Sequence, residues 1–537
     1  MSLVQTVPHK GKVAVIGAGI SGLSFAYFLN KLRPDININI YEARKQPGGW
    51  IRTETVYDDI KLERGPRTIR GVSDGSLLIV DVLKQLGHGD QIEVMPKTSI
   101  ANKKYLLSEK NELIQVPDDG KAKSFFKFMA SDLSSGLIPG ILGEPFRRKG
   151  PSQDQDESVE SFMNRRFGSK SITSNIFSAV LHGIHAGDVS KLSARSIVPK
   201  LVALESDSGS IIKGMFEKRG TGKPSNPTGP LLPLSLQKYQ EEISPDANLP
   251  ELSTTLKKYP MLKLRDGLQT LPNSMASYLQ SQPNVNISYE TSIENIDFGR
   301  SSIKTRDSKT DVKYDHIRST IDAKQLSKLL VDAPSSLTAS LKKVDYISIF
   351  LVNIYSRNVP LIPKNGHGFG FLVPKKIVNP ECLLGVIYDS DIEQNSIPLY
   401  RQSTKDEEEN TSSYSKITLM MGGHFYNDIE VPSPKIALRK IRHVLEHRLG
   451  VNLDGITIRT DDSSSSYPSS IGDNEILISF VTNKDCIPQY NVGYGEIHDS
   501  VNKLIGNKFS FGGMAFGSGI GLPDCVQNGL EGALKVS

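Results

Sequence analysis

A glycine-rich turn near the N-terminus constrains the fold of this chain more than any other feature. An apolar stretch, a glycine turn, a helical pattern and an alternating strand follow one another at Lys12–Ile16, Gly17–Gly22 (GAGISG), Ser21–Leu32 and Asp35–Tyr41. Glu42 comes at the end of the second strand, 20 residues after Gly22. A glycine pattern alone is a weak signal, but these parts in this order predict a βαβ unit that binds a dinucleotide.

Each residue type in the turn has a physical role in such a site. Gly17 permits a tight turn, Gly19 lets the backbone approach a pyrophosphate, and Gly22 allows helix and sheet to pack closely. The start of the helix offers free N–H groups to the phosphates, and Glu42 would accept hydrogen bonds from a ribose. The predicted cofactor contacts of this unit are Gly17, Ala18, Gly19, Ile20, Ser21, Gly22 and Glu42.

The residues after Glu42, with the sequence ARKQPGGWIR, indicate which dinucleotide is bound. They resemble an extension in the flavin amine oxidases and their relatives, in which a glycine pair and a basic residue hold the pyrophosphate from its second side. An enzyme that uses NAD would not need this extension. The resemblance implies one non-covalent FAD per chain, and it adds the contacts Ala43, Gly48, Gly49, Trp50 and Arg52.

Three later segments resemble further parts of the same superfamily. They are Gly267–Pro272 (GLQTLP), Tyr289–Ile296 (YETSIENI) and Phe511–Val526, which contains FGGM and GIGLPDCV. In the superfamily these segments begin the substrate half, touch the adenine and return to the flavin ring. The resemblance implies that the cofactor also contacts Ile293, Gly513, Leu522, Pro523, Asp524 and Cys525.

Five more segments resemble the protoporphyrinogen oxidase family in their order, and its fungal members most closely. They are Leu62–Gly71 (LERGPRTIRG), Gly183–Ala194 (GIHAGDVSKLSA), His367–Pro374 (HGFGFLVP), Leu383–Ser390 (LLGVIYDS) and Cys486–Tyr494 (CIPQYNVGY). The first segment adds Gly65, Pro66, Arg67 and Thr68 to the expected cofactor contacts. The resemblance implies a six-electron oxidation of protoporphyrinogen IX to protoporphyrin IX in haem biosynthesis, with three dioxygen molecules reduced to hydrogen peroxide.

The expected fold is α/β, with a two-dinucleotide-binding, Rossmann-like FAD domain interleaved with a mixed α+β substrate domain and a helical membrane-binding insertion. The FAD domain would comprise residues 1–99, 261–320 and 481–537, and the substrate domain residues 321–480. Residues 100–195 would form the helical insertion at the mouth of the substrate site. Residues 196–260 are rich in Ser, Pro, Gly and Lys, and we expect a largely disordered polar insertion with a flanking helix.

The same resemblance implies that the substrate contacts Arg67, Gly187, Ile349 and Phe369. Phe369 would stack on a pyrrole ring and Ile349 would lie against the macrocycle, although both residues also suit a core position on a strand. Gly187 is the small residue of an AGD turn, where a larger side chain would intrude on the pocket.

The sequence departs from the family at one position that matters for the substrate. Ser108 stands where plant and related enzymes have the Arg that holds a propionate, so Arg67 and Lys104 are candidate replacements. His185 and His367 are weaker candidates for a ligand contact. We expect no certain catalytic side chain and no metal ligand, because a flavin carries the redox chemistry itself.

Apolar residues recur at roughly helical spacing between Lys121 and Lys149, with basic residues at both ends. They are Phe125, Phe126, Phe128, Met129, Leu133, Leu137, Ile138, Ile141, Leu142 and Phe146. Such a segment is too short to span a bilayer but suits helices that lie in one leaflet, divided at Pro139-Gly140. A helix that covers the substrate domain is the alternative. The resemblance implies the inner mitochondrial membrane, on the side of the intermembrane space, with ferrochelatase and a homodimer as further partners.

Composition argues against several other classes of protein. Lys and Arg number 64 against 59 for Asp and Glu, which is too small an excess to predict a nucleic-acid-binding surface. The three cysteines are widely spaced and predict neither a disulfide framework nor a zinc site. A flavin amine or polyene oxidase and a flavoprotein without turnover remain as alternatives. Cys525 lies outside the context of covalent flavin attachment, which counts against the first.

Overall fold

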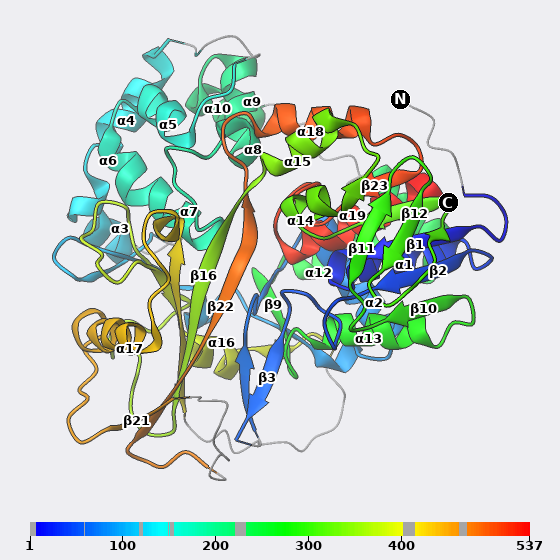
Figure 1. Ribbon diagram of the computed structural model, residues 1–537. Helices are drawn as coiled ribbons and strands as arrows, with labels where there is room; N and C mark the ends of the chain where they lie inside the picture. The colour runs from blue at the N-terminus through cyan, green and yellow to red at the C-terminus, as the bar shows by residue number, and fades with distance from the viewer. Residues whose placement is uncertain are drawn as a thin grey trace.

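Five parallel strands form the sheet that the N-terminal motif predicts (Figure 1). Their order is β10-β2-β1-β14-β23, with the bounds Val285–Ser288, Asn37–Tyr41, Lys12–Ile16, His316–Ser319 and Phe509–Phe511. Strands from the beginning, middle and end of the chain therefore share one sheet. The computed structural model describes residues 7–57, 59–117, 122–148, 150, 155–220, 232–400, 414–460 and 470–537.

Alternation along β1 gives this sheet two buried faces. Val13 and Val15 face a helical layer, in which α1 (Ile20–Leu32) packs against α13 (Thr270–Gln280) and α19 (Leu522–Val536), and α2 (Asp74–Gln85) contacts both of these. Ala14 and Ile16 face a second layer. That layer contains the sheet β13-β12-β11-β15 (Val312–Lys313, Ser302–Thr305, Ile293–Asp297, Leu330–Val331) and the helices α14 (Ala323–Leu329), α15 (Ser335–Lys342) and α18 (Tyr494–Leu504).

An eight-stranded mixed sheet forms the second half of the molecule. Its order is β21-β22-β16-β20-β18-β17-β7-β8, with the bounds Thr457–Thr460, Glu475–Gln489, Asp345–Ser356, Ser415–Gly423, Leu383–Ile387, Gly370–Leu372, Lys104–Leu107 and Leu113–Gln115. Alternating residues of β16 again divide between two faces. Phe350, Val352 and Ile354 pack with α17 (Pro434–His443) and η8 (Val444–Arg448). Ile347, Ile349 and Leu351 pack in a separate cluster on the opposite face.

Two of the expected domain boundaries differ from the strands as observed. β7 and β8 lie within residues 100–195, which were expected to be helical, yet both strands extend the eight-stranded sheet. β22 runs to Gln489 without interruption, so the sheet extends past residue 480 into the segment expected to belong to the FAD domain.

Most of the described part of residues 196–260 is helical, so the prediction of a largely disordered insertion is wrong there. The helices are α8 (Ala194–Ile197), α9 (Pro199–Ser208), α10 (Ile211–Gly220), α11 (Leu234–Lys238), η6 (Tyr239–Ile243) and α12 (Leu249–Leu256). Leu236, Tyr239 and Leu256 are fully buried in the core formed by α1 and α2. Packing therefore stabilises short helices whose local sequence is a weak helix former. Residues 221–231 lie outside the described part.

The apolar segment forms several short helices beside the eight-stranded sheet. They are α3 (Ala122–Met129), η3 (Asp132–Ser134), α4 (Leu137–Gly143) and η4 (Glu144–Phe146), followed by α5 (Val159–Phe167), α6 (Lys170–Ile172), η5 (Thr173–Phe177) and α7 (Ser178–Ile184). The chain does not break at Pro139-Gly140 as expected. Pro139 lies in the first turn of α4, where no intrahelical N–H bond is lost, and the break falls before Gly136 instead. Lys121 and Lys149 lie outside the described residues.

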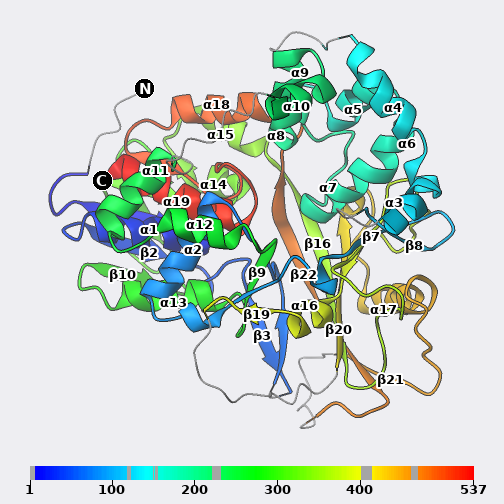
Figure 2. The same ribbon diagram turned by 180° about the vertical axis from the view of Figure 1, so that it is seen from behind.

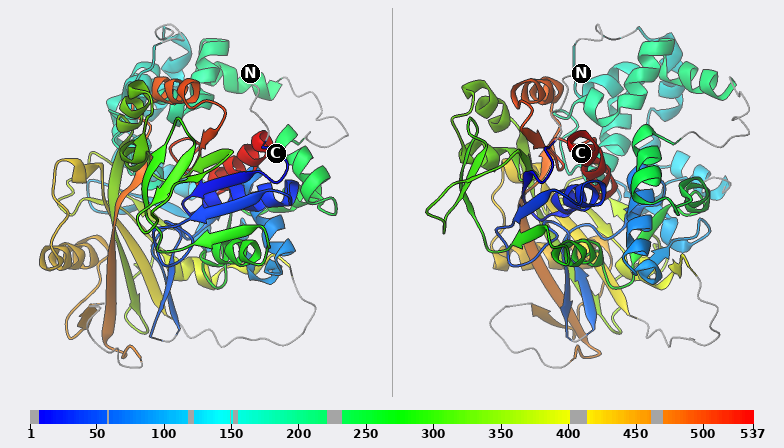
Figure 3. Two further views of the ribbon diagram at one scale, coloured as in Figure 1. Left: turned by 45° about the vertical axis from the view of Figure 1, so that its right-hand side comes forward. Right: turned by 90° about the vertical axis from the view of Figure 1, so that its right-hand side faces the viewer.

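Smaller elements join the two halves. They are the sheets β19-β6-β9-β5 (Ile397–Pro398, Ile92–Val94, Met261–Leu264, Ile69–Arg70) and β3-β4 (Thr53–Val56, Ile60–Glu63), with η1 (Gly89–Gln91), η2 (Ile100–Asn102), α16 (Asp389–Gln394) and η7 (His424–Asn427). Figures 2 and 3 show the five-stranded sheet beside the long strands β16 and β22, with the helices α4 to α10 at one end. None of the helices within the described ranges is long and apolar enough to cross a membrane.

Candidate active site

Two backbone loops meet where the pyrophosphate is expected. Gly19 and Gly48 form an isolated parallel bridge, and the Gly48 N–H donates to the Ala18 carbonyl at 2.9 Å. A side chain on Gly49 would come within 3.2 Å of the Gly19 Cα. The start of α1 has no side-chain cap, so its first N–H groups are left for a ligand. Both loops therefore present bare backbone to the same place.

Gly22 has a structural role that differs from that of Gly19. A Cβ on Gly22 would lie only 2.0 Å from the Gly17 carbonyl oxygen, whereas a Cβ on Gly19 meets nothing closer than the Gly49 Cα at 3.8 Å. Gly17 itself has a φ of +99°. The turn needs Gly17 and Gly22 in order to fold, and Gly19 keeps space free for a ligand.

Glu42 is held in place at the end of β2. Its carboxylate accepts hydrogen bonds from the backbone N–H groups of Ala18 and Arg44, both at 2.8 Å. The segment expected to touch the adenine is adjacent, because Thr291 N–H donates to the Glu42 carbonyl. Burial and the Glu42 carboxylate raise the pKa of Tyr289, a residue of the same segment. The Ile293 side chain lies in the core, and the contact of Ile293 with the cofactor stays a prediction.

Gln269 supports the second loop and was missed from the sequence. Its Nε2 donates to the Pro47 carbonyl at 2.8 Å, and a Cβ on Gly48 would lie 2.8 Å from the same nitrogen. The Oε1 of Gln269 is buried without a hydrogen-bond partner among the described residues. The nearby Arg52 forms an ion pair with Glu54, with 3.3 Å between Nε and Oε1. The GLQTLP resemblance marked the segment, but only the fold shows which side chain reaches the loop.

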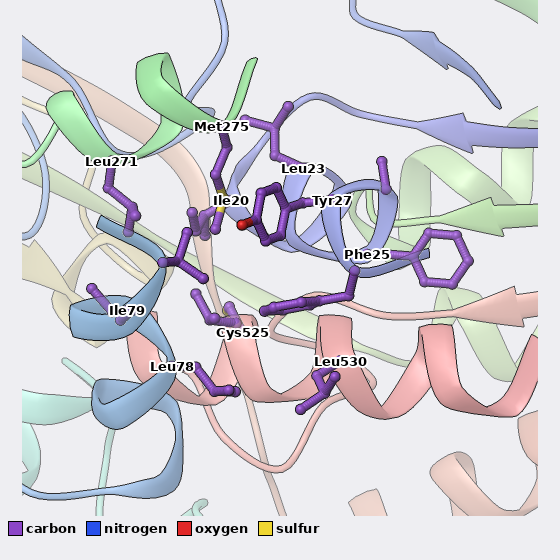
Figure 4. Close-up of a cluster of buried hydrophobic side chains, with 14 of the residues drawn as sticks. Ile20, Leu23, Phe25, Tyr27, Leu78, Ile79, Leu271, Met275, Cys525 and Leu530 are labelled. Carbon is purple, nitrogen blue, oxygen red and sulfur yellow. The ribbon is translucent and has the colours of Figure 1, made fainter. Parts of the chain in front are cut away.

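The start of α19 also approaches the site, although not through all the predicted residues. Leu522 and Pro523 are buried, and Asp524 accepts a hydrogen bond from Gly521 N–H at 3.0 Å. Cys525 points into the core between α1, α2 and α19, as Figure 4 shows, and its N–H is bonded to the Gly521 carbonyl. Burial raises the pKa of this thiol to about 11. The Cys525 thiol therefore faces the core, and the contact of this residue with the cofactor stays a prediction.

Arg67 is a buried cation at the junction of the two halves. Its Nε lies 3.2 Å from Asp389 Oδ1, and its Nη2 donates to the Gly65 carbonyl at 3.4 Å. Nη1 is buried without a hydrogen-bond partner among the described residues. The Asp389 carboxylate also accepts from Thr418 Oγ1 at 2.6 Å, which fixes it on the eight-stranded sheet. Gly65 packs against the glycine loop, since a Cβ on it would lie 2.0 Å from the Trp50 carbonyl.

Arg64 continues this polar network across the sheet. Its guanidinium donates to Asn353 Oδ1 at 3.1 Å on β16 and to Ser479 Oγ at 2.7 Å on β22. Asn353 donates in turn to Thr418 Oγ1 at 2.9 Å. The ERGPR segment is thus tied to three neighbouring strands by buried side chains. The sequence motif indicated Arg67, but its partner Asp389 lies hundreds of residues away, as does Asn353, the partner of Arg64.

Trp50 brings the cofactor loop into contact with an apolar wall. The wall consists of Ala186, Ile347, Ile349, Leu351, Leu384 and Cys486, and Trp50 packs against it. Ala186 has a φ of +50°, and the next residue, Gly187, is buried: a Cβ there would lie 2.2 Å from Gln489 Oε1. Ile349 and the AGD turn are therefore together, as the substrate prediction requires.

Phe369 lies in a different cluster from Ile349. It is half-buried and packs against Met95, Ala101, Met261 and Ile392. Its N–H donates to the Lys103 carbonyl at 2.7 Å, and the next residue, Gly370, pairs with Lys104 in the sheet.

Lys104 is exposed and next to Phe369, whereas Ser108 is at the far end of the same strand. Ser108 is buried, and its Oγ accepts the Glu112 N–H within the turn between β7 and β8. The structure therefore places a cation, Lys104, near Phe369 and gives Ser108 a role in the turn.

The two candidate histidines have different surroundings. His367 is partly exposed, and its Nδ1 lies 3.0 Å from Asp391 Oδ1. His185 is buried, which lowers its pKa to about 4 and keeps the ring neutral. Its Nδ1 has no hydrogen-bond partner among the described residues, and its ring lies 6.1 Å from that of Tyr490. His185 remains open to a ligand, whereas His367 is engaged by a carboxylate.

The comparison with known proteins agrees with this geometry. Residues 20–532 match the family described as flavin containing amine oxidoreductase, so the chain belongs to that family. FAD is accordingly its cofactor, and the bare loops at Gly19 and Gly49 and the fixed Glu42 carboxylate fit the phosphates and ribose of FAD.

Within this family the chain belongs with the protoporphyrinogen oxidases. It is 37% identical to protoporphyrinogen oxidase of Saccharomyces cerevisiae over 549 residues, which covers 98% of both chains. The identity to protoporphyrinogen oxidase of Schizosaccharomyces pombe is 28%, again over 98% of each chain. A crystal structure from Exiguobacterium, assigned as a protoporphyrinogen oxidase, superposes with a TM-score of 0.67 at 20% identity and 98% coverage of both chains, which supports the fold alone.

Proposed function

We propose that this chain oxidises protoporphyrinogen IX to protoporphyrin IX with dioxygen as the electron acceptor. The observation that carries the proposal is the contact between Trp50, on the cofactor loop, and the apolar wall around Ile349. A flat, largely apolar macrocycle placed on this wall would lie beside the flavin site. The identity to the named relatives supports the same substrate.

The overall change removes six hydrogen atoms from the substrate, and three dioxygen molecules become three hydrogen peroxide molecules. Bound FAD supplies the hydride chemistry, so the protein contributes binding and orientation. Ile349 and Ala186 provide apolar contact with the macrocycle, and Gly187 keeps side-chain bulk out of this corner.

Lys104 and Arg67 are the candidate cations for the two propionates of the substrate. Lys104 is exposed beside Phe369 and is free to reach a carboxylate at the edge of the macrocycle. Arg67 is buried beside Gly65 and Trp50, and we assign its unpaired Nη1 to the cofactor side of the site. Lys104 would thus bind a carboxylate of the substrate, and the buried Arg67 would face the cofactor.

Porphyrin fluorescence tests the proposal directly. Protein loaded with FAD is incubated in air with protoporphyrinogen IX, and emission is compared with the rate of autoxidation without protein. We expect enzyme-dependent emission together with hydrogen peroxide in a ratio of three per porphyrin. Turnover of an amine substrate, with no porphyrin formed above the control, would refute the assignment.

We further propose that the protein binds a membrane surface through the face formed by α3, α4 and η4. Six large apolar side chains are exposed there, with Phe146 exposed by 89%: Phe125, Phe126, Ile138, Ile141, Leu142 and Phe146. Phe128 and Leu133 are buried against the sheet, so the segment has one core face and one exposed face. Lys123, Lys127, Arg147 and Arg148 lie around the exposed face.

The resemblance to the eukaryotic enzymes supports placing this surface on the inner mitochondrial membrane, on the side of the intermembrane space. A homodimer, and ferrochelatase as the acceptor of the product, belong to the same proposal. Membrane contact suits this reaction because both the substrate and the product are poorly soluble in water.

A further inference from the structure

Helix α17 carries cations that have no acidic partner. Lys435, Arg439 and Arg442 are exposed, and no carboxylate within the described ranges lies in ion-pair distance of them. The opposite face of this helix is core, with Ala437 and Ile441 fully buried. The helix is therefore fixed to the sheet and holds the three cations toward solvent.

Apolar side chains surround these cations. Ile429, Val431 and Ile436 are exposed before and at the start of the helix. Val378, which is 84% exposed, lies at the end of the following element η8, where Arg448 donates to the Val378 carbonyl at 2.7 Å. Exposure of these apolar side chains to water is unfavourable. The interface of a bilayer accommodates both kinds of side chain, because it buries apolar groups and places cations beside the headgroups.

The same side of the molecule carries the apolar face of α3 and α4. Arg448 donates to Asn111 Oδ1 at 2.9 Å in the turn between β7 and β8, and Asn111 donates to the His447 carbonyl. Two residues earlier, Glu109 N–H donates to Asp132 Oδ2 in η3, between α3 and α4. Figures 1 and 2 show α17 and α3 along one edge of the molecule.

We propose that α17 is a second membrane-contact element, which binds the anionic headgroups of phospholipids. This inference rests on the proposed membrane association and adds to it the lipid class that the surface selects. Glu430 and Glu446 are exposed nearby, so the net attraction comes from Lys435, Arg439 and Arg442 together. The apolar face of α3 and α4 would provide burial, and α17 would provide the preference for anionic lipid.

Vesicle sedimentation with the FAD-loaded protein tests the inference. The triple variant K435Q/R439Q/R442Q is compared with the control K309Q/K313Q/K503Q, which removes three exposed cations on the far side of the molecule. Each protein is mixed with phosphatidylcholine vesicles that either contain or lack phosphatidylglycerol. We expect the α17 variant to lose on the order of 10- to 100-fold in partitioning to the anionic vesicles, with neutral vesicles unaffected.

The possible outcomes are distinct. If the α17 variant binds anionic vesicles as the wild type does, or if the control loses as much, α17 is not the lipid contact and only this inference fails. If the wild type binds neither kind of vesicle, the proposed membrane association fails as well. Porphyrinogen turnover in detergent should stay at the wild-type rate in both triple variants, and its loss in the α17 variant would also overturn the inference.

A fluorescent label provides an independent test of contact between α17 and the membrane. The native cysteines Cys382, Cys486 and Cys525 are buried, so a thiol reagent should label an introduced surface cysteine first. An environment-sensitive dye on Ile436→Cys should shift to the blue when anionic vesicles are added, and the same dye on Lys309→Cys should not. A shift at both positions, or at neither, would contradict the proposed orientation.

Discussion

At the residue scale, Gly19 and Gly22 lie at the start of the same helix, but substitution of Gly19 should affect FAD binding and substitution of Gly22 should affect stability. Gly19→Val adds atoms where only the cofactor is expected, because its Cβ meets nothing closer than 3.8 Å in the protein. We expect a folded protein with no bound FAD, measured by flavin absorbance and by an unchanged circular dichroism spectrum.

Gly22→Ala is the matched control for this prediction. Its Cβ would overlap the Gly17 carbonyl oxygen at 2.0 Å, so the protein itself should be destabilised. A Gly19→Val protein that retains FAD, or that fails to fold, would show that the pyrophosphate does not lie between these loops.

Phe369 provides a second prediction at this scale. Phe369→Ala should leave the FAD content normal and raise KM for protoporphyrinogen by roughly 5-fold, since an aromatic contact contributes about 1 kcal/mol beyond its area. The measurement is steady-state fluorescence kinetics with the flavin content determined in parallel. Because Phe369 also packs on Met95 and Met261, an unfolding curve is needed beside the kinetics. A drop in stability with KM unchanged would make Phe369 a core residue.

The sequence predicted residues of the site best where function depends on the backbone. Gly17, Gly19, Gly22 and Glu42 could be predicted from their spacing, and Gly48 and Gly49 from the family resemblance. Gln269 and Asp389 were missed as side chains because their partners, Pro47 and Arg67, are brought near only by the completed fold. The direction of the Cys525 thiol, into the core, was not predicted, because a motif gives positions along a helix but not the direction in which each side chain points.

At the scale of elements, the exposed face of α3, α4 and η4 carries a prediction about membranes. The variant F126S/L142S/F146S replaces only exposed side chains, so it should fold, keep FAD and move from the pellet to the supernatant in vesicle sedimentation. Leu133→Ser, on the buried face, should destabilise the protein instead by about 2–5 kcal/mol. If the exposed triple variant still sediments with vesicles, the anchoring surface lies elsewhere.

Elements with strong periodicity were predictable and short helices were not. The segment Asp35–Tyr41 alternates apolar and polar residues in the sequence, and it contains the observed strand β2, in which Ile38 and Ile40 are fully buried. The helices α11 and α12 are short and begin at prolines or near them, and only their packing on α1 and α2 gives them a stable structure.

At the scale of the whole molecule, three buried histidines predict how stability depends on pH. Burial lowers the pKa of His182, His185 and His316 to about 4 in each case, below the value near 6.5 of an unfolded histidine. The native state therefore binds fewer protons than the unfolded state between these values. Stability from these groups is complete above pH 6.5 and is lost as the pH falls toward 4.

Urea unfolding of the FAD-loaded protein at a series of pH values checks this prediction. The free energy of unfolding should fall by a few kcal/mol between pH 7 and pH 4.5. His316→Asn should reduce this slope, because it removes one of the buried titrating groups, whose Nε2 lies 2.7 Å from Ser510 Oγ. Glu63, whose pKa burial raises to about 7, acts in the opposite direction and loses stability as the pH rises from 4.5 to 7. A free energy of unfolding that does not change between pH 7 and pH 4.5 would contradict the lowered pKa values of the three histidines.

The position of α19 means that the N-terminal part of the chain cannot finish folding before the C-terminus has been synthesised. This helix packs along α1, and Val7 N–H donates to the Val536 carbonyl at 3.2 Å. The N-terminal part of the FAD domain therefore lacks the helix that covers α1 until the last residues are synthesised. The apolar surface of α1 that α19 covers is exposed to solvent for most of the time that translation takes. We therefore expect dependence on chaperones over that interval, and a chain that stops before residue 522 should neither bind flavin nor persist in the cell.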